Sequence, residues 1–260
     1  MKTTLSLLVG LLLAATAQAQ ERPFVYTVAT TGNAPGPDTR SWAVYYDTGY
    51  GERPADPIGY DGAEQRLGFQ GRPWRGLTLI GDVAVGTGGD TVRSSQQAEL
   101  LTDLVGSRSK LRLAVGIGAR REWEGTSTAL ARVSLGWSGD RALVFGNLRL
   151  EKPFERGRDP VDVITTLGWS QRLGHGLRVG VEGVGEDLEG FWEAEEAEGG
   201  ARLYVGPALH WSSPAGRLWL SASGGPIVYA THSGRTSLAP RPLDASTNGF
   251  TMRLSIGYTF

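Results

Sequence analysis

Apolar and polar side chains alternate along short segments of this chain, and turn-forming residues separate the segments. The pattern is clearest over residues 250–260, where every second side chain is apolar or aromatic. The apolar positions there are Phe250, Met252, Leu254, Ile256, Tyr258 and Phe260. Successive side chains of a β-strand point to opposite faces, so this pattern predicts a strand with one apolar and one polar face.

The same period of two recurs from residue 40 to the end of the chain and predicts an all-β fold. The twelve predicted strands are 40–50, 62–71, 76–87, 93–104, 108–121, 127–138, 140–151, 160–172, 176–187, 200–212, 216–230 and 247–260. An even number is expected of a bacterial barrel with both chain ends on one side. Because 62–71 and 93–104 alternate weakly, ten or fourteen strands are alternatives.

The connections between these strands alternate in length. The short ones are 72–75, 105–107, 138–140, 173–175 and 213–215, and the others are 51–61, 88–92, 122–126, 152–159, 188–199 and 231–246. All of the second group except 88–92 are longer, as expected of barrels with short periplasmic turns and longer outer loops. The alternation predicts a closed, antiparallel, up-and-down transmembrane β-barrel with both ends in the periplasm.

The N-terminus has the features of an export signal. A basic start, an apolar run and the sequence Ala17-Gln18-Ala19 predict a signal peptide over residues 1–19, cleaved near Ala19. Its apolar run is shorter than the roughly 20 residues of a membrane-spanning helix. We interpret residues 20–39, which end in a Gly/Pro-rich stretch, as a periplasmic N-terminal leader, and residues 40–260 as the single barrel domain.

The final strand, which ends in the aromatic residue Phe260 on a chain with an export signal, resembles the terminal strand of bacterial outer-membrane β-barrel proteins. In that family the C-terminal aromatic residue is read by the assembly machinery. The resemblance implies a location in the outer membrane of a Gram-negative-type bacterium. It also implies two partners, the outer-membrane lipid and the assembly machinery, which would bind the C-terminal strand.

Aromatic residues gather on the apolar faces, near the predicted periplasmic ends of the strands. Indole rings favour the membrane interface, where the ring body is apolar and the N–H reaches water or headgroups. The predicted membrane-interface aromatics are Trp42, Trp137, Trp169, Trp211, Tyr258 and Phe260. The alternative is that the tryptophans are core residues of a soluble β-protein.

The polar faces carry charges of both signs, with arginine in the majority. The predicted lumen-lining residues are Arg66, Asp82, Lys110, Arg112, Arg120, Arg132, Arg149, Asp162, Arg172, Arg178, Glu182, Arg202 and Arg253. Barrels of about eight strands are filled and those of about sixteen are open, so twelve strands predict a narrow polar pore. Charge pairing that closes the lumen is an equal alternative. An open lumen with excess arginine predicts a mild preference for anions.

Composition excludes several classes of function. The chain has no cysteine, which rules out disulfides, thiolate metal sites and a lipidated N-terminal cysteine. Its net charge of -1 predicts no nucleic-acid partner, and no motif predicts a cofactor. An acidic run comprising Glu193, Glu195, Glu196 and Glu198 is a weak candidate for divalent cations, against the more common reading of a solvated loop.

One constellation suggests catalysis. His210 and Ser212 lie two residues apart on one strand face, a spacing at which a base can approach a nucleophile. The pair is superficially similar to the His-x-Ser element of outer-membrane phospholipases. That family orients its histidine with an asparagine about a dozen residues further on, whereas here no asparagine occurs between Ser212 and Asn248.

Together these patterns favour a barrel without enzymatic activity, either a narrow passive channel for small polar solutes or a structural, surface-exposed protein. A lipid-directed outer-membrane hydrolase that uses His210 and Ser212 is the second hypothesis. A soluble periplasmic ligand-binding barrel, with its apolar faces pointing inward around a ligand, is the third.

Overall fold

A computed structural model gives the fold of most of the region predicted to form the barrel. It describes residues 42–51, 62–74, 76–88, 91–105, 110–122, 125–155, 160–192, 201–231 and 249–260. The predicted signal peptide and the predicted leader lie outside these residues.

The described residues form twelve strands, and each overlaps a predicted strand over most of its length. The strands are β1 (Trp42–Gly51), β2 (Gly62–Trp74), β3 (Leu77–Gly88), β4 (Thr91–Val105), β5 (Leu111–Glu122), β6 (Ser127–Ser138), β7 (Ala142–Pro153), β8 (Asp162–Gly174), β9 (Leu177–Glu186), β10 (Arg202–Ser212), β11 (Leu218–Tyr229) and β12 (Gly249–Thr259). A short 3-10 helix, η2 (Leu188–Phe191), follows β9. No helix among the described residues is both long enough and apolar enough to cross a membrane.

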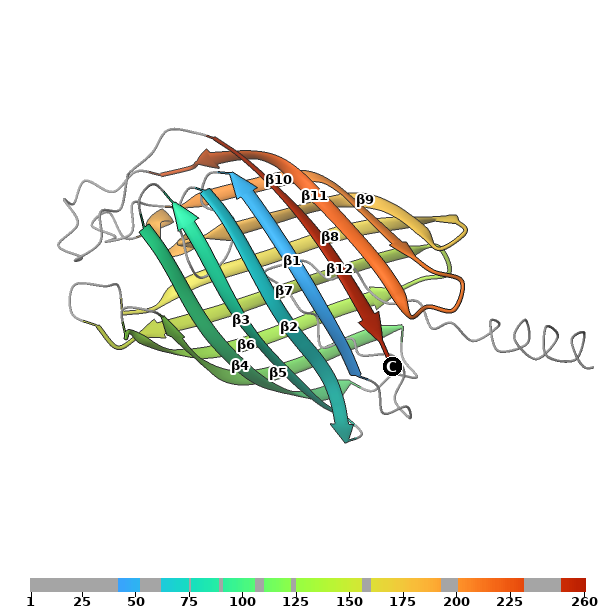
Figure 1. Cartoon of the computed structure of the whole chain (residues 1–260), viewed down its shortest axis with the longest axis horizontal. Helices are drawn as coiled ribbons and strands as arrows, with labels where there is room; N and C mark the ends of the chain where they lie inside the picture. Colours follow the sequence, from blue (N-terminus) through green and yellow to red (C-terminus); the bar gives the residue numbers. More distant parts are fainter. Residues whose placement is uncertain are drawn as a thin grey trace, which may run out of the picture.

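Every strand pairs with its neighbours in the sequence, and β1 pairs with β12. The sheet therefore closes on itself, and the predicted antiparallel, up-and-down barrel is confirmed. Figure 1 shows the strands running obliquely to the long axis of the molecule, with β1 and β12 side by side. Oblique strands are a geometric requirement of closing a sheet into a barrel.

The closing seam ends where the chain ends. The backbone N–H of Trp42 donates to the carbonyl of Phe260 at 3.2 Å, and the N–H of Phe260 donates to the carbonyl of Trp42 at 3.0 Å. Since β1 begins and β12 finishes at this point, Trp42 and Phe260 lie at the same end of the barrel. This end, which also carries the turns after the even-numbered strands, is called the short-turn end below, and the opposite end is called the loop end.

The short turns have backbone conformations that hairpins require. His175 and Gly176, which join β8 to β9, have φ values of 52° and 76°. Positive φ at both central positions is the signature of a type I′ turn, whose twist matches that of the flanking strands. The two strands that precede the longest connections, β9 and β11, finish at the loop end.

The two faces of the barrel wall differ in the sense that the alternation predicts. In β12, Thr251 and Arg253 are buried, whereas Met252 and Leu254 are about half exposed, at 52% and 51%. In the other strands too, large apolar side chains cover the outside, while the inside holds most of the charged side chains together with buried apolar ones such as Ile80 and Phe145. A soluble barrel that binds a ligand inside would need the opposite arrangement.

Candidate functional site: the inner face of the barrel

Charged side chains on the inner face of β4 to β7 form two neighbouring groups of ion pairs. Arg132 donates from Nε to Glu99 Oε2 at 2.7 Å, and its Nη2 lies against Glu99 Oε1. Gln97 donates to the same Oε1 at 2.7 Å. Their side chains are withdrawn from water, with exposures of 1% for Arg132 and 0% for Glu99. A buried charge of this kind requires a partner, and here it has a bidentate one.

The next carboxylate along this wall is shared by two arginines. Glu151 accepts from Arg120 at 2.6 Å and lies 2.6 Å from Arg149. Arg120 also lies 3.3 Å from Glu122. The Arg120–Glu151 pair joins β5 to β7, and the Arg132–Glu99 pair joins β4 to β6, so each of these two pairs reaches across one intervening strand. Side chains held in this way are fixed against the wall by their partners on other strands.

A second network lies on β2, β3 and β12. Arg66 pairs with Glu64 at 2.9 Å and approaches Asp82 at 3.9 Å. Arg253, on the last strand, lies 3.7 Å from the other oxygen of Glu64. This network therefore crosses the seam at which the barrel closes. All four side chains are buried.

Ion pairs also occur near both ends of the barrel. Arg72 pairs with Asp103 at 2.5 Å toward the short-turn end. Toward the loop end, Arg202 pairs with Asp187 at 2.7 Å and with Glu186 at 3.1 Å. The acidic segment that follows β9 thus folds against the wall at its first residues, although the sequence suggested a surface loop there.

Helix η2 extends this contact at the loop end. Glu189, which is buried, accepts a hydrogen bond of 2.9 Å from the backbone N–H of Val163 at the start of β8. Asp187 takes a left-handed conformation, with φ of 50°, to turn the chain into the helix. A carboxylate therefore binds a backbone donor at the point where β8 extends beyond its pairing with β9.

The remaining predicted lumen residues occupy several environments. Asp162 and Arg178 are buried, whereas Arg112 is half-buried. Glu182 is buried and accepts a hydrogen bond from the hydroxyl of Tyr204 at 3.0 Å. Arg172, at the end of β8, and Lys110, just before β5, are exposed at the short-turn end. Lys110 lies 3.9 Å from Asp140, on the adjoining turn.

Aromatic side chains on the inner face lie over glycines of the next strand. A Cβ atom added to Gly68 would sit 2.2 Å from the ring of Tyr45, and one added to Gly257 would sit 2.1 Å from the ring of Trp219. Both aromatic residues are buried. Glycine in a strand allows such a ring to lie flat against the sheet, which compensates for the side chain that glycine lacks.

His210 and Ser212 make contacts to different partners. Nδ1 of His210 lies 2.8 Å from the hydroxyl of Ser221 on β11, and its ring stacks on Trp219 with centroids 6.1 Å apart. The hydroxyl of Ser212 donates to the carbonyl of Gly176 at 3.5 Å, in the neighbouring turn. His210 is buried, and the serine hydroxyl beside its imidazole is that of Ser221 rather than that of Ser212.

The predicted interface aromatics lie on the outer face at the short-turn end. Trp42 and Phe260 flank the seam, and Trp137, Trp169 and Trp211 lie close to the ends of β6, β8 and β10. Tyr258 stacks on Phe260 with ring centroids 6.5 Å apart. These side chains are exposed or half-buried. They form a band at one level around part of the barrel.

The predicted cation-binding glutamates, Glu193, Glu195, Glu196 and Glu198, lie outside the described residues. Within the part of the chain that the structure describes, no group of three or more acidic or histidine side chains is arranged to hold a metal ion.

Comparison with known proteins gives the fold a context. No protein-family model matches the chain, and no curated protein matches it. Among solved structures, a KdgM porin in complex with disordered oligogalacturonate is similar, with a TM-score of 0.56 and 11% identity over 84% of this chain and 99% of that chain. The NanC porin has a TM-score of 0.57 and 10% identity over 83% of this chain and 98% of that chain. The fold is that of a bacterial outer-membrane β-barrel. At such low identity the likeness extends to the fold alone.

Sequence reasoning missed several acidic residues of the barrel's inner face. Within the strands, the buried acidic residues that it did not single out are Asp47, Glu64, Glu99 and Glu151. All four occupy inward positions of their strands, and three of them pair with predicted arginines. Strand parity would have found Glu64 and Glu151, because each lies two residues from a predicted inner arginine on the same strand. Asp47 faces Arg66 only through the register of β1 with β2, and Glu99 faces Ile80 and Gly118, so parity alone points to neither.

Proposed function

We propose that the protein is an outer-membrane channel for small polar solutes. The observation that carries the proposal is the division of the closed wall into an apolar outer face and a charged inner face. Apolar side chains on the outside suit contact with hydrocarbon, and polar side chains inside suit contact with water and solutes. The predicted export signal and the similarity in fold to two porins support the same location.

The charged networks make this a narrow channel. Inner side chains such as Arg132 and Glu99 are almost fully buried, so water does not surround them at that level of the wall. Solutes would pass beside a layer of paired charges rather than through a wide aqueous tube. One of the similar porins was solved in complex with oligogalacturonate. A solute that is polar and elongated is therefore the first class to test here.

Selectivity follows from the balance of the inner charges. Arginines exceed acids among the predicted lumen residues, which favours anions. The acidic partners Glu64, Glu99 and Glu151 offset much of that positive charge. We therefore expect a weak preference for anions. Replacing an inner carboxylate by its neutral amide should strengthen this preference.

Planar-bilayer recording tests the proposal. Purified, folded protein should give discrete, small conductance steps, and a salt gradient should give a reversal potential on the anion side. A silent bilayer that contains folded barrel would overturn the channel and favour the structural alternative.

A further inference from the structure

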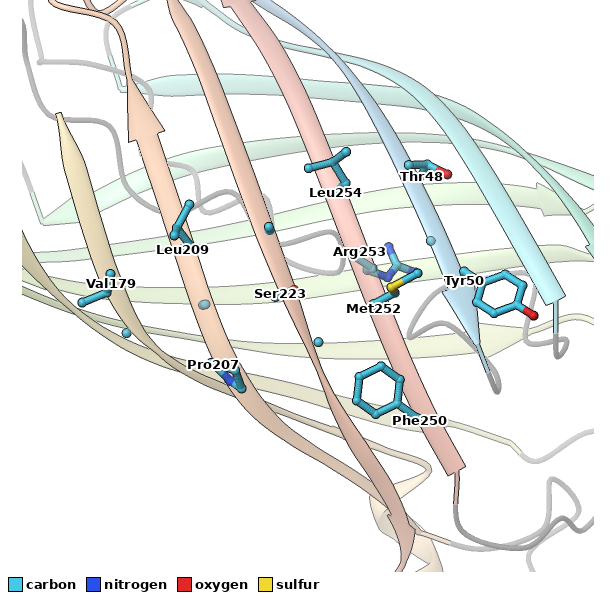
Figure 2. Close-up of a pocket in the computed structure, with 15 residues that line it drawn as sticks. Thr48, Tyr50, Val179, Pro207, Leu209, Ser223, Phe250, Met252, Arg253 and Leu254 are labelled. Carbon is cyan, nitrogen blue, oxygen red and sulfur yellow. The ribbon is translucent and has the colours of Figure 1, made fainter.

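The outer face carries a groove of about 730 Å³ over five consecutive strands, β9 to β12 and β1. Figure 2 shows the side chains that line it, which are spread across these strands. Val179 and Leu209 lie on one side of the view, and Tyr50, Met252 and Phe250 lie on the other. The groove therefore belongs to the face that meets the membrane and is separate from the inner charged networks.

The strand register explains the shape of the groove. Three rows of residues run across the strands, perpendicular to the chain direction. The central row, whose side chains point inward, is Gly180, Ala208, Ser223, Arg253 and Gly49. One flanking row, whose side chains point outward, is Val179, Leu209, Ala222, Leu254 and Thr48. The backbone of the central row forms the floor, and the outward rows form the walls.

The second wall contains Pro207 on β10, Gly224 on β11, and Met252 and Tyr50 on the next two strands. Gly224 is paired with Met252, and the register of β10 with β11 places it opposite Pro207. With Ala222 in the first wall, β11 contributes only small side chains to both walls. The groove is therefore widest in the middle of its length.

The dimensions of the groove match a single hydrocarbon chain. The two walls stand two residues apart on each strand, about 6.8 Å, which is too narrow for a helix of about 10–12 Å diameter. Four inter-strand spacings of about 4.8 Å give a length of about 19 Å. Half of a hydrocarbon core of about 30 Å, the depth of one leaflet, is about 15 Å.

The groove also reaches the loop-end boundary of the apolar belt. Val179 is the third residue of β9, which begins at the short-turn end, and Tyr50 lies near the finish of β1, at the loop end. Tyr50 is 62% exposed, and a tyrosine at a membrane boundary can keep its ring in hydrocarbon while its hydroxyl bonds a headgroup.

We propose that this groove binds one acyl chain of a membrane lipid from the leaflet at the loop end, with the headgroup beside Tyr50. The walls are mostly apolar, and the width of the groove admits one unbranched chain. In the second wall, which is nearer the loop end, the hydroxyl of Tyr50 is placed where a headgroup would lie. A second copy of the barrel would present a convex, ridged surface that touches the groove over a short part of its length. The proposal needs the barrel to lie in a bilayer, but it does not need an open lumen.

Photolabelling in vesicles tests the proposal. The folded protein would be reconstituted in phosphatidylethanolamine and phosphatidylglycerol that contain a trace of phospholipid with a diazirine in the middle of one acyl chain. Surrounding lipid tails are as apolar as the groove, so only closer packing favours the bound chain over free lipid. Because that advantage is small, we expect about a threefold excess of label on peptides from β11 and β12 over peptides from β5 and β6. Ala222→Trp, which fills the groove, should remove the excess.

Ala131→Trp is the matched control, because Ala131 points outward from β6 on another part of the wall and is exposed. It should leave the excess on β11 and β12 unchanged. Migration with and without heating verifies that each variant is folded, and Ala222→Leu replaces Ala222→Trp if the larger side chain prevents folding. Even labelling around the barrel would overturn the proposal. An excess of label that persists when the side chain at Ala222 is enlarged would overturn it as well. So would a barrel-to-barrel crosslink that Ala222→Trp abolishes while lipid adducts persist.

Discussion

The buried pair between Glu99 and Arg132 provides a sharp test of what the inner networks contribute to stability. Both oxygens of Glu99 face the guanidinium of Arg132, and neither side chain is more than 1% exposed. Glu99→Gln removes the negative charge and turns an amide NH2 group toward the N–H donors of Arg132. Arg132 keeps its charge in a buried position, so the substitution should lower the free energy of unfolding by about 3–5 kcal/mol.

This loss corresponds to a decrease of about two to three and a half orders of magnitude in the folding equilibrium constant. Urea titration of the reconstituted barrel, followed by tryptophan fluorescence, should show a lower midpoint for Glu99→Gln. A double variant with Glu99→Leu and Arg132→Met removes both charges and should unfold near the wild-type midpoint, because an apolar pair of similar size replaces the ion pair at little cost.

Lys110→Gln is the control for the loss of a surface charge. Its partner, Asp140, lies 3.9 Å away, and both side chains are largely exposed, so the midpoint should not move. The reasoning is refuted if Glu99→Gln unfolds at the wild-type midpoint, or if the double variant is as unstable as the single one. Either result would mean that the buried charges are solvated by groups other than each other.

Three further predictions concern other parts of the wall. Gly68→Ala places a methyl group against the ring of Tyr45 and should destabilise the barrel by about 1–3 kcal/mol. The same substitution should lower the urea midpoint much less in a Tyr45→Ala background, and an equal loss in both backgrounds would contradict the contact. Phe260→Ala should reduce insertion into the outer membrane of cells, measured by fractionation, while refolding into detergent stays normal; equal insertion would contradict a role in recognition by the assembly machinery. Ser212→Ala and the wild type should hydrolyse phospholipid at the same background rate, and a rate that falls in the variant would revive the hydrolase hypothesis with His210 as base.

Alternation with a period of two predicted the strands well because each face of the wall meets one kind of environment. Even 62–71 and 93–104, where alternation is weak, correspond to β2 and β4. Their weakness has a physical reason. β2 carries Gly71 at an outward position that the ring of Trp42 covers, and β4 presents Ser94 and Gln96 on outward positions near the loop end. Outward apolar residues are therefore missing where the ring of a neighbouring strand covers the position, or where the position lies near the polar loop end.

The pairing of the inner charges could not be read from the sequence in the same way. Arg132 meets Glu99 across an intervening strand, at a separation of 33 residues, and this contact depends on the register of two hairpins and the curvature of the wall. Arg253 meets Glu64 only because the last strand pairs with the first. Period-two patterns place a side chain on a face but do not tell which partner it will meet there.

The contact between the first and last strands has a consequence for how this molecule reaches its final form. Until residues 249–260 arrive, both β1 and β11 present unpaired backbone groups, which are templates for association with other chains. Contacts so distant in the chain also carry a large entropic penalty and form slowly. The polypeptide therefore has exposed strand edges that favour association with other chains until β12 pairs with both β1 and β11.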